Sequence, residues 1–171
     1  MSEREIVGLL ARLEAAGRRL ECSRARVEAG APWPTGSQAR GEAEEHWGPT
    51  EVLAHAAEML PFWLGEMERV LAAPAGGPPP FGRTTSDQVR TLTVARDATL
   101  PPRELFARIA AGIERYRRRL PELSAAEAAR SGRHPTRGEL SVVELIERFA
   151  VGHLEEHAAQ LEEVVGGDHA A

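Results

Sequence analysis

Hydrophobic positions recur at spacings of three and four over four long stretches of the chain, a period typical of amphipathic helices. In the first stretch the apolar positions are Ile6, Leu9, Leu10, Leu13, Ala16, Leu20 and Val27, with charged residues between them. Gly30, Pro32 and Pro34 then interrupt the pattern. We therefore predict a first helix that ends within residues 29–36.

The second stretch follows residues 47–49, and we expect Thr50 to cap its N-terminus and Glu51 to lie in its first turn. Its inward stripe consists of Val52, His55, Met59, Phe62 or Trp63, Met67 and Val70. Pro61 removes a backbone donor and should kink the helix. Because the period continues over residues 62–71, we expect the helix to continue as well.

Residues 72–100 read as a long flexible connection within the domain. Residues 74–83 are dominated by proline and glycine, which favours an exposed and mobile segment. Residues 84–100 carry only a weak signal, which is compatible with a short extended piece or a ragged helix.

The third helix is expected to begin at Pro101 or Pro102 and to stop at Pro121. Its apolar positions are Leu105, Ile109, Ile113, Tyr116 and Leu120. Four arginines between Arg115 and Arg119 fit a solvated helix end, where cations favour the negative C-terminal pole.

Two further helix starts have the spacing of a capping box, Ser124 with Glu127 and Ser141 with Glu144. The second of these opens the fourth long helix. Its stripe is Val142, Ile146, Phe149, Ala150, His153, His157, Leu161 and Val164. With few competing strand signals, the sequence predicts an all-α protein, a single domain over residues 1–171 built as an antiparallel four-helix bundle with long crossover connections.

Histidines occupy three of the inward positions. His153 and His157 are four residues apart, so their Cβ atoms lie about 5 to 6 Å apart on one helical face, from which two imidazoles can bind one metal ion. His55 lies on the inward stripe of another helix. A face of three histidines leaves a coordination position open, as in catalytic sites. We therefore predict that His55, His153 and His157 bind a divalent metal ion.

The remaining histidines, His46, His134 and His169, are interpreted as ordinary surface residues. Residues 153–157 also match the H-x-x-E-H pattern of inverted zinc peptidases. We interpret the match as accidental, since only 14 residues follow His157 and they supply no acidic ligand on a further helix. The zincin motif and the Glu-x-x-His pairs of di-iron bundles are missing from the sequence.

The composition of the chain limits the kinds of partner that we expect it to bind. The net charge of −5 with interspersed signs gives no electrostatic footprint for nucleic acid. No apolar run approaches the roughly 20 residues of a membrane span. The single Cys22 forms no intramolecular disulfide, and no segment resembling a secretory signal opens the chain, so we expect a cytoplasmic protein.

Three short motifs in a fixed order support a family resemblance. They are Trp47 with Thr50-Glu51-Val52-Leu53-Ala54-His55, His134-Pro135 with Gly138-Glu139-Leu140-Ser141, and Val151-Gly152-His153-Leu154-Glu155-Glu156-His157-Ala158-Ala159-Gln160-Leu161. In these motifs the chain resembles the DinB/YfiT-like superfamily of metal-binding helical bundles. The resemblance spans nearly the whole chain and is weakest over residues 74–100.

This resemblance implies an up-down-down-up four-helix bundle, frequent homodimers, and a divalent ion held by three histidines, here His55, His153 and His157. Many members have Asp directly after the first histidine of the pair, where this chain has Leu154. Glu155, Glu156 and Glu51 are the alternatives for the acid or base role of that position. Imidazole donors suit zinc, nickel, iron and copper alike.

Relatives in this superfamily include transferases and isomerases that use thiols of low molecular weight, such as mycothiol or bacillithiol. A metal ion favours the thiolate form of a bound thiol, so the protein itself needs no catalytic cysteine and Cys22 is expected to be inert. The resemblance therefore implies a metal-dependent thiol S-transferase that acts on a small molecule. Met59, Phe62 and Trp63 are the candidates for lining its substrate pocket.

Two other functions fit the same residues. In the first, the ion acidifies water rather than a thiol, which makes the protein a metal-dependent hydrolase. In the second, the protein is a non-catalytic, dimeric stress protein that binds a metal or a small ligand.

Overall fold

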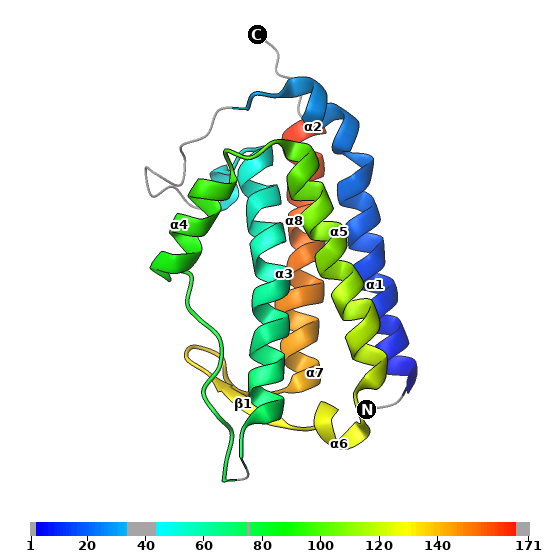
Figure 1. Cartoon of the computed structure of the whole chain (residues 1–171), viewed down its shortest axis with the longest axis vertical. Coiled ribbons are helices and arrows are strands. Elements are labelled where there is room, and N and C mark those ends of the chain that lie inside the picture. Colours follow the sequence, from blue (N-terminus) through cyan, green and yellow to red (C-terminus); the bar gives the residue numbers. More distant parts are fainter. Residues whose placement is uncertain (1–2, 34–43, 75, 167–171) are drawn as a thin grey trace.

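The fold is mostly helical, as predicted. In the computed structural model, which describes residues 3–33, 44–74 and 76–166, four helical segments lie side by side along the long axis (Figure 1). They are α1 (Glu3–Cys22), α3 (Pro49–Ala72), α5 (Pro102–Arg119) and a C-terminal segment made of α7 (Val142–Leu145), the π-helical η3 (Ile146–Gly152) and α8 (His153–Gly166). Helices α1 and α3 each contact both α5 and α8.

Ser23 interrupts the first predicted helix. Its backbone N–H donates to the carbonyl of Leu20, and the chain resumes as α2 (Arg24–Gly30), which ends at the predicted glycine. Buried apolar residues of α1, Leu13 and Leu20 among them, still belong to the common core.

Gly48 caps helix α3, so the prediction that Thr50 is its N-cap is wrong. The Glu51 carboxylate accepts a hydrogen bond from the Gly48 N–H at 2.8 Å, and Pro49 occupies the first helical position, where no N–H is needed. Thr50 is buried inside the first turn. The helix continues across Pro61, as predicted, and places both His55 and Trp63 on buried positions.

The connection between α3 and α5 contains helix α4 (Gln88–Asp97), which packs against α3 (Figure 1). Asp87 caps α4, because its carboxylate accepts a hydrogen bond from the Arg90 N–H at 2.8 Å. The weak signal over residues 84–100 thus corresponds to a short helix.

A small antiparallel hairpin, formed by β1 (Ser131–His134) and β2 (Gly138–Ser141), lies beside the C-terminal end of α3 (Figure 1). These strands were not predicted from the sequence. Arg133 exchanges backbone hydrogen bonds with Pro79 and Phe81, so the hairpin also holds the segment that follows α3. Gly132 permits this contact, because a Cβ atom there would lie 2.6 Å from the Phe81 ring.

Two short elements precede the hairpin, η2 (Leu120–Glu122) and α6 (Ala125–Ala128), and η1 (Glu44–His46) precedes α3. Both predicted capping boxes are present, at the start of α6 and at the start of α7. None of the helices in the described part of the chain is both long and apolar enough to cross a bilayer.

Candidate metal centre

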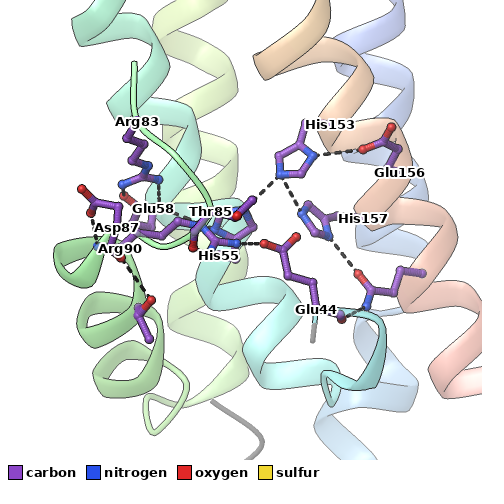
Figure 2. A network of polar contacts seen from close by, with 12 residues as sticks. Glu44, His55, Glu58, Arg83, Thr85, Asp87, Arg90, His153, Glu156 and His157 are labelled. Atoms are coloured by element: carbon purple, nitrogen blue, oxygen red, sulfur yellow. Dashed lines mark hydrogen bonds and ion pairs between the residues drawn. The ribbon is translucent and has the colours of Figure 1, made fainter. Parts of the chain in front are cut away.

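The three predicted histidines meet in the interior of the bundle. Nε2 of His153 lies 3.1 Å from Nε2 of His55 and 3.2 Å from Nε2 of His157 (Figure 2). His55 comes from α3, whereas the other two come from the first two turns of α8. His55 and His157 are each 2 % exposed, whereas the side chain of His153 is 28 % exposed.

Each histidine has a proton acceptor near its other ring nitrogen. Nδ1 of His153 lies 3.0 Å from the Glu156 carboxylate, and Nδ1 of His157 lies 2.9 Å from the side-chain oxygen of Gln160. The amide nitrogen of Gln160 donates to the backbone carbonyl of Glu44, which assigns the acceptor end of that amide to His157.

With a proton on each Nδ1, each Nε2 atom carries a free lone pair, and these lone pairs point toward one another. Burial is the main cause that lowers the pKa of all three imidazoles, and for His153 and His157 a neighbouring ring lowers the pKa further. Three neutral rings with converging lone pairs repel unless a cation lies among them. Zinc–nitrogen bonds of about 2.05 Å in a tetrahedral site place two nitrogens about 3.3 Å apart, close to the separations seen here. The cluster therefore fits a divalent ion.

Glu44 adds a carboxylate to the cluster. One of its carboxylate oxygens and the three histidine nitrogens all lie within 4.8 Å of one another. The same carboxylate forms an ion pair with Arg90 of α4, whose side chain is 8 % exposed (Figure 2). Glu44 was not predicted from the sequence, since it lies in a short segment without helical period. Its one signal in the sequence is its position three residues before Trp47.

Trp47 packs against the rings of the cluster. Its ring is stacked parallel to that of His157, with centroids 6.1 Å apart, and it meets His55 edge-on at 5.2 Å. Together with the amide of Gln160, this tryptophan fixes η1 beside the cluster. Glu44 is thereby held through its own backbone carbonyl and through Trp47, which follows it in the chain.

Glu58 connects the cluster to Arg83. Its carboxylate lies 3.6 Å from Nδ1 of His55 and accepts two hydrogen bonds from the Arg83 guanidinium, at 2.5 and 2.6 Å. The Arg83 guanidinium in turn covers the Phe62 ring at 3.8 Å. Contacts with His55 and Arg83 lower the pKa of Glu58 despite its burial, so the carboxylate is charged and favours a proton on Nδ1 of His55.

The π-helical segment η3 ends directly before His153. A π-helical turn holds an extra residue and so changes the direction of the side chains that follow it. Phe149 within this segment and His153 after it both face one cavity. Such turns are frequent at functional sites.

A cavity of about 880 Å³ adjoins the histidine cluster, a size typical of small-molecule sites. His55, His153 and Glu44 line it on the side of the cluster, and Trp63, Phe149 and Leu140 supply apolar surface. The other lining residues are Arg83, Thr84, Thr85, Arg90, His134, Thr136, Arg137, Glu144, Glu147, Arg148, Gly152 and Glu156.

The proposed pocket residues are placed differently from one another. Trp63 lines the cavity, whereas Met59 is fully buried in the core and Phe62 packs under Arg83.

His46 is exposed, as predicted. His134 is only 4 % exposed, so its interpretation as a surface residue is wrong: it ends strand β1 and stacks on Phe149, with ring centroids 4.8 Å apart. The prediction for His169 falls outside the described residues.

The glutamates suggested for an acid or base role have other contacts. Glu156 lies on the Nδ1 side of His153, away from the point where the Nε2 atoms converge. Glu155 forms a bidentate pair with Arg12 at 2.8 and 2.9 Å, and Glu51 caps α3. The position of Glu156 does not suit a general base acting at the ion.

Comparison with known proteins gives one family. The family model of the DinB superfamily matches residues 10–161, which include all three clustered histidines and Glu44. No curated protein and no solved structure matches the chain. The match extends over most of the bundle and over the hairpin and the connection that surround the cavity. The chain therefore belongs to the DinB superfamily.

Proposed function

We propose that the protein is a metal-dependent thiol S-transferase whose divalent ion is held by His55, His153 and His157, with Glu44 as a fourth ligand that an incoming group can displace. The observation that carries this proposal is the convergence of three histidine Nε2 atoms, with separations of 3.1 and 3.2 Å, beside a cavity of small-molecule size. Arg90 offers the Glu44 carboxylate a partner when it leaves the ion.

The ion, when bound, would act as a Lewis acid that favours the thiolate form of a thiol at neutral pH. The nucleophile is expected to come from a cosubstrate such as bacillithiol or mycothiol. Cys22, the chain's single cysteine, is exposed on α1 and does not line the cavity. In the reaction the thiol loses its proton to solvent water, the sulfur forms a bond to an electrophilic carbon, and the leaving group departs with the electrons of the bond that breaks.

The protein's own residues have two tasks in this scheme. Glu58, Glu156 and Gln160 keep protons on Nδ1, so that Nε2 of each histidine remains a donor for the ion. Trp63 and Phe149 provide an apolar wall against which the acceptor can be oriented.

Further features of this proposal rest on the family resemblance. We infer an up-down-down-up course of the bundle, which the sequence colours of the four segments in Figure 1 support. A single domain, a homodimeric assembly and a cytoplasmic location belong to the same proposal. Zinc, nickel and iron all suit the three imidazoles.

A panel of thiols tests the activity. Protein loaded with zinc, nickel or iron is incubated with bacillithiol, mycothiol, glutathione or cysteine and with the electrophile monobromobimane. We expect saturable conjugation with at least one thiol and its loss in the His153→Ala variant. Turnover of an ester without any thiol would support a hydrolase instead, and metal binding without turnover of either kind would support a non-catalytic protein.

A further inference from the structure

The charged side chains that line the cavity beside the histidine cluster differ in how closely they are paired. Four glutamates and four arginines line it, which by number alone would balance. The hydrogen bonds and ion pairs of these eight side chains show which charges remain for a ligand.

All four glutamates are engaged. Glu44 pairs with Arg90, and Glu156 lies against Nδ1 of His153. Glu144 accepts hydrogen bonds from the backbone N–H and the hydroxyl of Ser141, both at 2.7 Å. Glu147 pairs at 2.7 Å with Arg12, which is not a lining residue.

The arginines divide into two pairs. Arg83 and Arg90 each have side chains only 8 % exposed and are bound to Glu58 and Glu44. Arg137 and Arg148 are exposed at the edge of the cavity, and neither makes a hydrogen bond or close ion pair with a carboxylate of the described residues. The charge of Arg148 acts on Glu144 only at longer range, where it helps to lower the pKa of that carboxyl group. The cavity therefore presents two guanidinium groups that are free of close ion pairs and can bind a ligand.

These two cations line the cavity from separate elements. Arg137 lies in the turn between β1 and β2, and Arg148 lies in the π-helical segment η3. Burial is the main cause that lowers the pKa of His134, and the charges of Arg137 and Arg148 each lower it further. The His134 ring is also part of the cavity wall.

The surface next to them is aromatic. Phe149 stacks between Trp63, with centroids 4.3 Å apart, and His134, with centroids 4.8 Å apart. These three rings all line the cavity. A ligand that fills this space meets an apolar wall along its body and cations at its end.

We infer that the cavity recognises an organic anion, with a carboxylate, sulfonate or phosphonate group bound by Arg137 and Arg148 and an apolar body packed along Trp63 and Phe149. This inference rests on the proposed function in one respect, namely that the reacting end of the ligand lies at the histidine cluster. The anionic group belongs either to the acceptor substrate or to the thiol cosubstrate, which share this chemistry.

Binding titrations test the inference. The probes are 4-methylbenzenesulfonate and its neutral counterpart 4-methylphenyl methyl sulfone, followed by the tryptophan fluorescence of the full chain. Sulfonates coordinate metal ions weakly, so a preference for the anion reports on the arginines. We expect the sulfonate to bind about fivefold more tightly, as two exposed ion pairs allow, both in zinc-loaded protein and after treatment with a chelator.

Paired variants separate a specific effect from a change of net charge. In Arg137→Gln/Arg148→Gln the preference is expected to fall to about one. In Arg103→Gln/Arg115→Gln it should persist, because these arginines are exposed on α5 outside the cavity. A preference for the sulfonate that the first variant retains would overturn the inference.

A second pair of probes locates the anion. 2-Mercaptoethanesulfonate and 2-mercaptoethanol are titrated into zinc-loaded protein. If only the thiol pair shows a preference for the anion that depends on Arg137 and Arg148, the anionic group belongs to the cosubstrate. If only the aryl pair shows it, the anionic group belongs to the acceptor. If neither pair shows such a preference, the inference is rejected. If the preference is present but the protein does not retain a metal ion, only the proposed function is contradicted.

Discussion

The Glu58 carboxylate lies 3.6 Å from Nδ1 of His55, on the side of the imidazole ring opposite the atom that meets the other histidines. Because this carboxylate favours a proton on Nδ1, Glu58→Gln should weaken metal binding by about tenfold. Competition with a chromophoric chelator measures the change. Glu68→Gln is the matched control, since Glu68 lies on the same helix but pairs with Arg119. Equal affinity in both variants would show that Glu58 has no part in holding His55.

Glu44 is expected to bind the ion directly, which a second substitution tests. In Glu44→Gln the loss of an anionic ligand should reduce the affinity for Co²⁺ and change the visible absorption of the cobalt-loaded protein. Glu163→Gln, an exposed position near the end of α8, should leave both unchanged. A cobalt spectrum of Glu44→Gln identical to that of the wild type would contradict direct ligation.

The histidine cluster was predictable because its residues interrupt a strong periodic pattern. The helical period predicts apolar side chains at the positions of His55, His153 and His157. A spacing of four residues brings the last two together on one helical face. Glu44 gives no such signal, since η1 is a single turn whose position depends on tertiary contacts with Trp47 and Gln160.

The hairpin explains the error at His134. Gly132, Pro135 and Gly138 around this histidine are typical of an exposed loop. In the structure the strands pair instead, and backbone hydrogen bonds between Arg133 and the segment after α3 bring His134 under Trp63 and Phe149. Contacts of this kind, between segments more than 50 residues apart in sequence, cannot be read from local pattern.

Packing between α3 and α5 depends on a glycine. A Cβ atom at Gly112 would lie 2.9 Å from Cβ of Leu60, which is fully buried. Gly112→Ala should therefore reduce the free energy of unfolding by about 1 to 3 kcal/mol. Gly65→Ala, in α3 with no atom within 4 Å of the new Cβ, should instead raise it by about 0.4 to 1 kcal/mol. Urea denaturation measures both, and a stabilising Gly112→Ala would contradict this close contact.

Burial of His134 predicts a dependence of stability on pH. Burial, with smaller effects from the charges of Arg137 and Arg148, lowers the pKa of this ring below its ordinary value of about 6.5. The unfolded chain then takes up a proton that the folded chain does not, so stability falls as the pH drops through about 6.5.

A variant that cannot be protonated isolates this contribution. The difference in melting temperature between His134→Gln and the wild type should shift in favour of the variant as the pH falls from about 7 to about 5. Both proteins are measured with a chelator present, so that the titration of the other histidines is shared. A difference that stays constant over this range would mean that His134 is accessible to protons in the folded protein.

Metal content tests the central claim most directly. Wild type, His153→Ala and His46→Ala are purified in parallel, loaded with zinc, desalted and analysed for zinc and protein. His46 is exposed and has no part in the cluster, so its variant controls for the loss of a histidine. We expect close to one ion per chain in the wild type and in His46→Ala and almost none in His153→Ala. Equal zinc content in all three proteins would contradict a site built from His55, His153 and His157.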